Sequence, residues 1–188
     1  MTGSKPEKDH PVNYVTGDSM SRALVISAED FEDFEFGYPY YRLQEAENVE
    51  VDVATPDGEE VEGEYGYSFD ADLKVEEVEV SDYDAVVLPG ANSPENLRMN
   101  CEEAIGLVER FDEEGKVVAS VCHAAQVLIS AGIVEDRDAT CWWGVMDDLE
   151  AAGANVKDRS VVVDGNLVTS RCPDDLPDFM REVLGKLE

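Results

Sequence analysis

Short apolar runs recur along this chain and are separated by amphipathic segments. Four runs are rich in β-branched residues and lie at 22–28, 49–55, 85–88 and 116–121. Buried strands of parallel sheets have this composition because both of their faces are covered. Helices are expected between and after these runs, at 31–47, 93–114, 124–131, 145–152 and 173–186. This order predicts an α/β sandwich with a mainly parallel sheet.

Turn and breaker residues refine this outline. Residues 60–74 alternate in polarity, and the runs 160–164 and 167–170 flank Gly165-Asn166, so both segments are expected to form hairpins. Pro39 predicts a kink in the first helix. Ser93 is a good N-cap, and the sequence from Asn100 to Glu103 resembles a capping box that opens a second helix.

The chain is long enough for one domain. It has 188 residues, of which 43% are hydrophobic, so it can bury a substantial core. Residues 1–20 are polar and are expected to form a flexible extension before a single domain at 21–188. These residues lack the apolar core of a signal peptide, and no run approaches the ~20 apolar residues of a membrane span. We therefore expect a cytoplasmic protein.

Acidic residues are spread along the whole chain. The 44 Asp and Glu against 14 Lys and Arg give a formal net charge of −30. Such a charge disfavours binding to nucleic acids and to anionic membranes, because phosphates are repelled. A dispersed acidic surface is typical of proteins from salt-accumulating archaea, where concentrated salt screens the self-repulsion. The alternative is an ordinary acidic cytosolic protein.

The four cysteines, Cys101, Cys122, Cys141 and Cys172, match no zinc motif and no secreted disulfide framework. Free thiols are expected, and no metal or cofactor is. Cys122 stands out because Ser120-Val121-Cys122-His123-Ala124 joins a buried strand to a helix with small residues on both sides. A nucleophile elbow needs this pattern, and the following helix N-terminus favours a thiolate. The alternative is a buried cysteine that packs as a small hydrophobe.

Four stretches together resemble the PfpI/ThiJ family of intracellular proteases and parkinsonism-associated deglycases. They are AEDFEDFEFGYPYYRL, DAVVLPGANSPENLR, VASVCHAAQVLISAG and VVVDGNLVTSRCPDDLPDFMREVL, and they span position 22 to the end. The resemblance implies a flavodoxin-like three-layer sandwich related to class I glutamine amidotransferases.

The resemblance also assigns site residues. It places the nucleophile on Cys122 and a buried, protonated glutamate that donates to the thiolate on Glu32. The histidine that follows the nucleophile is His123, although sequence neighbours on a helix do not normally face each other. An acid from a neighbouring subunit that orients this histidine falls on Glu95, for which helix capping is the alternative. The family's assembly implies a homo-oligomer.

The family's backbone oxyanion donors fall on Gly90 and Ala91, where relatives usually carry two glycines, and the backbone N–H of His123 is a third candidate. Ala124-Ala125 replaces Gly-Pro, and both changes add bulk near the pocket. Trp142-Trp143 lines either the site or the core. A redox pair between Cys122 and Cys172 is conceivable.

Three functions are compatible with these residues. The first is a cysteine-dependent hydrolase of deglycase or glyoxalase type, acting on methylglyoxal and its adducts in stress protection. The second is an intracellular cysteine peptidase, which needs a competent His123 to protonate the leaving amine. The third is a non-enzymatic redox sensor or chaperone whose Cys122 oxidises to a sulfinate. The expected partners are small electrophiles or glycated and peptide substrates.

Overall fold

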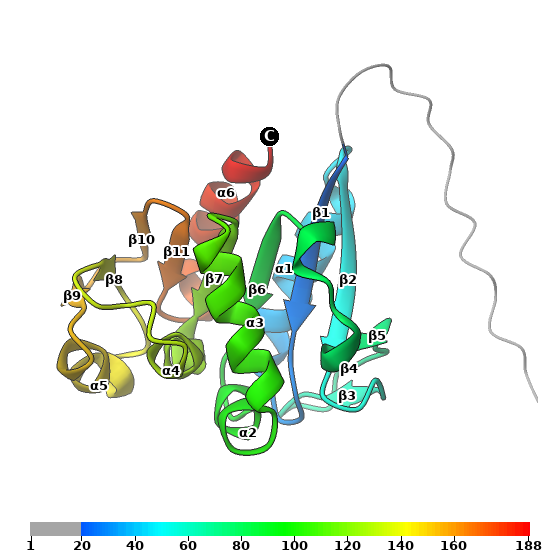
Figure 1. Ribbon diagram of the computed structural model, residues 1–188, viewed down its shortest axis with the longest axis horizontal. Coiled ribbons are helices and arrows are strands. Elements are labelled where there is room, and N and C mark those ends of the chain that lie inside the picture. Colours follow the sequence, from blue (N-terminus) through cyan, green and yellow to red (C-terminus); the bar gives the residue numbers. More distant parts are fainter. Residues whose placement is uncertain (1–19) are drawn as a thin grey trace, which may run out of the picture.

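The computed structural model describes residues 20–188, so the expected extension at 1–20 lies, apart from Met20, outside the described residues. A seven-stranded sheet runs through the molecule in the order β10-β11-β7-β6-β1-β2-β5 (Figure 1). All neighbouring pairs are parallel except β10 and β11, which form an antiparallel edge. The predicted, mainly parallel sheet is confirmed.

The strands of this sheet are β1 (Ser21–Ile26), β2 (Val49–Thr55), β5 (Leu73–Lys74), β6 (Ala85–Leu88), β7 (Val117–Val121), β10 (Val161–Asp164) and β11 (Leu167–Ser170). Short pairs outside it are β3 (Val61–Glu62) with β4 (Ser68–Phe69) and β8 (Asp138–Ala139) with β9 (Asn155–Val156). The expected hairpin at 60–74 is thus only β3 and β4, because β5 instead joins the main sheet in parallel with β2.

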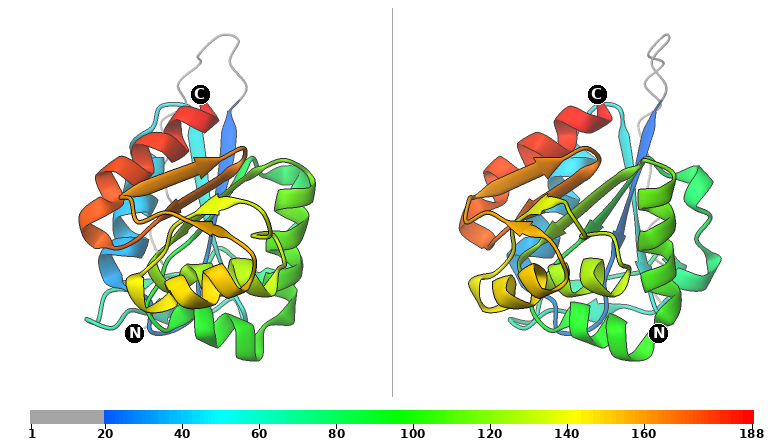
Figure 2. Two further views of the ribbon diagram at one scale, coloured as in Figure 1. Left: turned by 90° about the vertical axis from the view of Figure 1, so that its left-hand side faces the viewer. Right: turned by 60° about the vertical axis from the view of Figure 1, so that its left-hand side comes forward.

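The helices are α1 (Asp33–Glu45), α2 (Ser93–Asn100), α3 (Glu102–Glu113), α4 (Ala125–Ser130), α5 (Met146–Ala151) and α6 (Leu176–Leu187). They cover both faces of the sheet (Figure 2). One core contains α1 and α6, and the other contains α2, α3, α4 and α5. Successive residues of β1 alternate between these cores, with Leu24 and Ile26 in one and Ala23 and Val25 in the other.

The observed N-caps of α2 and α3 each lie one residue from the N-caps that the sequence predicts. The N-caps of α2 and α3 are Asn92 and Cys101, and neither makes a side-chain capping hydrogen bond. Ser93 is fully buried instead, and its hydroxyl accepts a hydrogen bond from the N–H of Ala28 at 2.9 Å. This contact fastens α2 to the end of β1. Pro39 lies inside α1, which continues across it as one helix.

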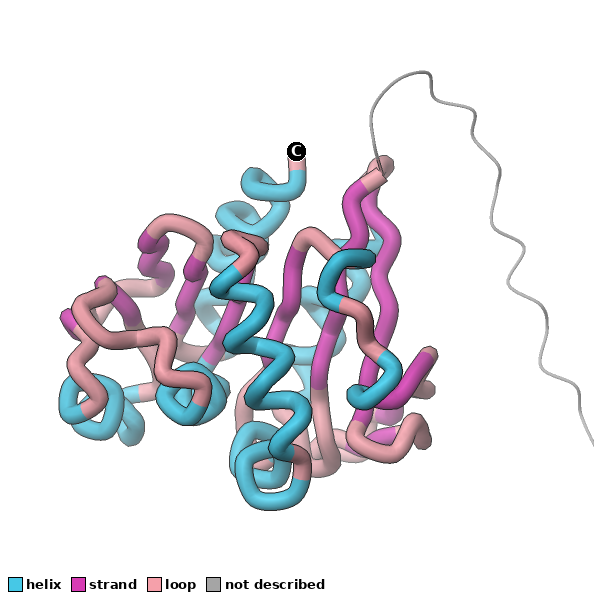
Figure 3. Tube along the Cα trace, viewed as in Figure 1, coloured by secondary structure: helices cyan, strands magenta, loops and turns pink. Residues whose placement is uncertain are grey.

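The carboxyl ends of the parallel strands lie along the lower edge of the sheet in Figure 1. Loops and short helices gather along the same edge (Figure 3). Open α/β sheets carry their sites there, because the crossover connections diverge from that edge. No helix within residues 20–188 is long and apolar enough to cross a bilayer.

Candidate active site

The expected elbow is present where β7 ends. Cys122 directly follows the strand and has a φ of 62°, in the left-handed region that residues with a Cβ rarely adopt. A single 3₁₀ turn, Cys122–Ala124, then leads into α4. This turn leaves the Cys122 side chain beyond the strand end, where it is 6% exposed. The strained backbone conformation at Cys122 therefore positions its sulfur.

A buried carboxyl group faces that sulfur, and it belongs to Glu35. Its residue is fully buried on α1, and its Oε2 accepts a hydrogen bond from the Gly90 N–H at 2.9 Å. Its Oε1 has no hydrogen-bond partner, and the carboxyl group interacts with the side chain of Cys122. A Cβ at position 90 would collide with Glu35 Oε2 and with the Cβ of Cys122, so this close approach requires glycine.

The sequence-based placement of this carboxyl on Glu32 is wrong. Glu32 is the half-buried N-cap of α1, and its Oε2 accepts a hydrogen bond from the N–H of Glu35 at 2.7 Å. Because the helix begins at Asp33, Glu35 falls on the buried face together with Pro39 and Leu43. That spacing of four residues was visible in the sequence as a signal for Glu35.

Glu35 and Cys122 compete for one proton. The pKa of Glu35 is raised to about 8, chiefly by burial and also by the charge of Glu32, although the hydrogen bonds to Cys122 and Gly90 act in the opposite direction. Burial also raises the pKa of Cys122, and an ionised Glu35 adds to that rise. Both groups cannot ionise together at low cost. A thiolate is therefore favoured only while Glu35 keeps its proton and donates it toward the sulfur.

This environment differs from the simple helix-terminus effect that the sequence suggested. Burial raises the pKa of Cys122 by more than the backbone N–H groups of His123 and Ala91 lower it. Both of these N–H groups therefore face the sulfur. Gly90 does not join them, because its N–H is occupied by Glu35. Of the three expected oxyanion donors, Gly90 is thus unavailable, whereas Ala91, which has a φ of 58°, and His123 remain candidates.

The elbow brings the side chains of Cys122 and His123 into contact, although neighbouring residues on a helix do not normally face each other. The Nδ1 of His123 lies 3.3 Å from the Sγ of Cys122. Burial lowers the pKa of His123, while the charges of Glu64 and Glu95 raise it. The ring stacks on that of Trp142, with centroids 6.0 Å apart. Glu95 is an exposed residue in the first turn of α2, and it lies within electrostatic range of His123 in the same chain.

The other candidate residues divide between site and scaffold. Trp142 is half-buried, and its backbone N–H donates to the carbonyl of Cys122 at 3.2 Å, which stabilises the elbow. Trp143 is 47% exposed beneath the guanidinium of Arg171. Cys172 is buried, donates to Asp175 at 3.5 Å and forms no disulfide with Cys122.

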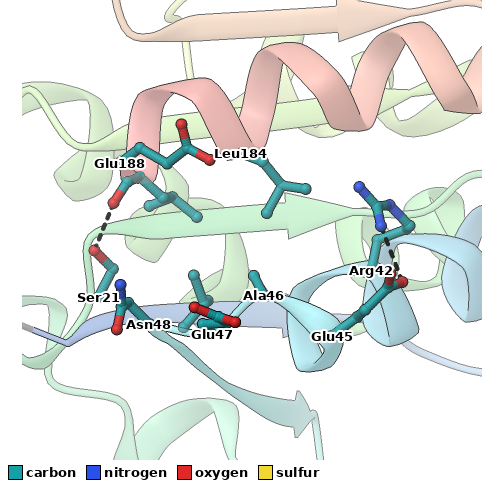
Figure 4. Close-up of a pocket in the computed structure, with 10 residues that line it drawn as sticks. Ser21, Arg42, Glu45, Ala46, Glu47, Asn48, Leu184 and Glu188 are labelled. Carbon is teal, nitrogen blue, oxygen red and sulfur yellow. Dashed lines mark hydrogen bonds and ion pairs between the residues drawn. The ribbon is translucent and has the colours of Figure 1, made fainter. Parts of the chain in front are cut away.

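Two further features bear on ligand binding. Within residues 20–188 no group of three or more His, Cys, Asp or Glu is placed to hold a metal ion. A hollow of about 610 Å³ lies between the start of β1 and the ends of α1 and α6, and its lining includes Ser21, Arg42 and Leu184 (Figure 4). It does not include Cys122, so it is separate from the elbow.

The sheet, the elbow and the buried carboxyl define a class of α/β proteins that carry a cysteine at a strand-to-helix turn. The chain belongs to the DJ-1/PfpI family, whose model matches residues 21–186. The resemblance noted in the sequence is thereby confirmed, and the fold is the flavodoxin-like one of this family.

Relatives and solved structures agree with this assignment. The chain is 50% identical over 163 residues to an uncharacterized protein of Archaeoglobus fulgidus, covering 87% of this chain and 96% of that protein. It is 45% identical over 167 residues to the deglycase PfpI of Pyrococcus furiosus, covering 89% and 99%. A two-domain protein from Anabaena variabilis with DJ-1/ThiJ/PfpI-like and ferritin-like domains superposes with a TM-score of 0.86 at 37% identity, covering 89% of this chain and 50% of that one.

Proposed function

We propose that this protein is a cysteine-dependent hydrolase that converts methylglyoxal, free or as adducts on amines and thiols, into lactate. The observation that carries the proposal is the buried Glu35 carboxyl facing Cys122 without a compensating cation. A proton donor beside a thiolate suits addition to a carbonyl, where a negative oxygen forms and must be protonated. The relatives named deglycase in three Pyrococcus species support this class of reaction.

The steps balance without an oxidant. The thiolate of Cys122 attacks the aldehyde carbon of methylglyoxal, and the aldehyde oxygen takes the Glu35 proton to give a hemithioacetal. The Glu35 carboxylate then removes the hydrogen from that carbon as a proton and returns it to the neighbouring carbon, while the hydroxyl proton passes to the former ketone oxygen. These two proton transfers leave a lactoyl thioester. Water cleaves the carbon–sulfur bond, so that methylglyoxal and water become lactic acid. In this proposal the developing oxyanion is held by the N–H groups of Ala91 and His123, which both face the sulfur.

Lactate release from methylglyoxal in concentrated KCl tests this proposal. Cys122→Ala should abolish turnover, because the carbon–sulfur bond cannot form. Cys101→Ala is the matched control, since Cys101 is a buried thiol in the other core, and it should retain turnover. Equal turnover in wild type and Cys122→Ala would overturn the proposal.

A cysteine peptidase is the second candidate, and one contact favours it. The 3.3 Å separation of His123 Nδ1 and Cys122 Sγ is suitable for a histidine that protonates a leaving amine. His123→Ala should then abolish peptide cleavage yet only weaken methylglyoxal turnover, where Glu35 moves the proton. Peptide cleavage that survives this change would identify a contaminating protease.

The assembly and the setting belong to the same proposal. We propose a cytoplasmic homo-oligomer in which Glu95 also approaches the His123 of a neighbouring subunit, and light scattering at high salt should show a mass above that of a monomer. The charge of −30 further predicts adaptation to concentrated salt. Lowering KCl from 3 M to about 0.1 M should lower the melting temperature, because the Debye length grows from under 3 Å to about 10 Å. An unchanged melting temperature would contradict the halophilic origin.

A further inference from the structure

Three loops meet beside the elbow and are joined by backbone hydrogen bonds. The N–H of Asp30 donates to the carbonyl of Glu62 at 2.9 Å, and the N–H of Glu64 donates to that of Phe31 at 2.9 Å. The N–H of Asn92 donates to the carbonyl of Asp30, also at 2.9 Å. The backbone of the loop after β3 is therefore joined to the segments that lead into α1 and α2, which places this loop beside the site.

Glu64 is the member of this loop that acts on the site. Its side chain is exposed, and its Oε1 accepts a hydrogen bond from the side-chain amide of Asn92 at 3.5 Å. Its charge raises the pKa of Glu35 and of His123. Both of these residues contact the Cys122 side chain, so the carboxylate of Glu64 is within electrostatic range of the groups that surround the reacting atom.

No strong cation offsets this negative charge. The carboxylates around the loops are those of Asp30, Glu32, Glu62, Glu64 and Glu95. Among residues 20–188 none of these five forms an ion pair with Lys or Arg. Arg98 on α2 is turned to Ser130 and Gln126. A group that approaches Cys122 therefore meets uncompensated negative charge.

We propose that Glu64 selects the charge of the electrophile that reaches Cys122, so that neutral and cationic carbonyl compounds are favoured over anionic ones. The inference rests on the proposed function, because it takes Cys122 to be the nucleophile. It narrows the substrates to neutral dicarbonyls and to adducts carried on basic side chains. Aldehydes that bear a carboxylate or a phosphate are repelled, since like charges interact over about 10 Å at moderate ionic strength.

Two alkylating reagents of the same shape test this without any need for turnover. Iodoacetamide is neutral and iodoacetate is anionic. In both cases the Cys122 thiolate attacks the methylene carbon, a carbon–sulfur bond forms, and iodide leaves. Because both reagents react with the same thiolate, the ratio of their rate constants does not depend on the thiol's pKa. The ratio therefore measures only how strongly charge is selected.

In wild type the ratio of iodoacetamide to iodoacetate rates at Cys122, mapped by mass spectrometry, should exceed that of 2-mercaptoethanol. Glu64→Gln should lower the protein's ratio about twofold at ~0.1 M salt, the effect of one charge roughly 10 Å away, and by less in concentrated KCl. Glu182→Gln is the matched control. It removes one exposed charge from α6, the helix whose end lines the hollow of Figure 4, and should leave the ratio unchanged.

Equal ratios in Glu64→Gln and Glu182→Gln would overturn this inference, because net charge rather than position would then be responsible. All variants are compared at one KCl concentration, the lowest at which every one of them has a native circular dichroism spectrum. Methylglyoxal turnover is measured on the same samples. If turnover depends on Cys122 while the ratios are equal, only the role of Glu64 fails. If Cys122→Ala retains turnover, the proposed function fails, whatever the ratios are.

Discussion

Asp52 and Glu35 are carboxyl groups held in two different ways at opposite ends of the central strands. Near the amino end of β1, Asp52 binds the guanidinium of Arg22 at 2.6 Å and accepts a hydrogen bond from the Tyr83 hydroxyl at 2.9 Å. The guanidinium also lies over the Tyr83 ring at 4.9 Å. Beyond the carboxyl end of β1, Glu35 is fully buried and receives only the Gly90 N–H and the Cys122 sulfur.

The difference shows how one sheet separates stability from chemistry. A carboxylate paired with a cation stays ionised and fastens strands together. A carboxyl without a cation in an apolar site keeps its proton well above the usual range, which makes that proton available for transfer. Each end can therefore be altered with a different expected consequence.

The largest expected effect is on how stability depends on pH at the Glu35 end. Glu35 has a pKa raised to about 8 in the folded state, so between its unfolded value near 4.5 and pH 8 only the folded protein retains the proton. Stability should therefore fall as pH rises through this window and level off above it. The cost is on the order of 5 kcal/mol at most, from 1.36 kcal/mol per pKa unit.

Urea unfolding of wild type and Glu35→Gln from pH 5 to 9 measures this effect. The difference between the two proteins isolates Glu35 from the many other acids. The variant should gain relative stability as pH rises, since it has no carboxyl to ionise. A difference that stays constant with pH would mean that Glu35 is already ionised at pH 5.

The next effect is on turnover. Glu35→Gln keeps the shape of the side chain but removes the transferable proton, so methylglyoxal turnover should fall about 10²- to 10⁴-fold. Asp52→Asn removes an acid at the other end and should leave turnover near that of wild type. A similar loss in both variants would show that the two ends do not differ in function.

A smaller effect is expected from the cation at the Asp52 end. Arg22→Ala leaves Asp52 without its counter-ion and should cost about 1–2 kcal/mol of unfolding free energy. This figure is the usual contribution of a hydrogen-bonded charge pair, reduced because the Arg22 side chain is 38% exposed and solvent screens the charges. Chemical denaturation measures the loss. Turnover at a temperature where the variant is folded should not change, and a specific loss of turnover would break the comparison.

The smallest effect separates Glu32 from Glu35. Glu32→Ala removes the side-chain cap of α1 and should cost about 1 kcal/mol. Turnover should change no more than a few-fold, because the Glu32 carboxylate binds a backbone N–H rather than the sulfur. Thermal melts with parallel assays test this, and a loss as large as that of Glu35→Gln would restore Glu32 as the catalytic acid.

These two glutamates also show what could be predicted from sequence. The strands were predictable, because continuous apolar runs such as 85–88 can only be buried on both faces. The elbow was predictable from small residues around Cys122. The carboxyl was not identified, because Glu32 and Glu35 both stand in an acidic stretch, and only the exact start of α1 decides which one points inward. The periodicity of Glu35, Pro39 and Leu43 carried that information.

The contacts around the sulfur could not be read from the chain at all. Gly90 donates to a residue 55 positions away, and Trp142 donates to Cys122 across another loop. Sequence spacing cannot report such distances. It also could not show that the Gly90 N–H is taken by Glu35 and that His123 turns back to meet its own neighbour.

The hydrogen bond between Gly90 and Glu35 has a consequence for how the protein folds. It joins the loop after β6 to α1 and closes only after β1 has paired with both β2 and β6, so it belongs to the slow, long-range part of folding. Helices and local turns can form earlier without a functional sulfur. During refolding, selective reactivity of Cys122 should therefore emerge later than helical circular dichroism, which makes the thiol a reporter of the completed chain topology.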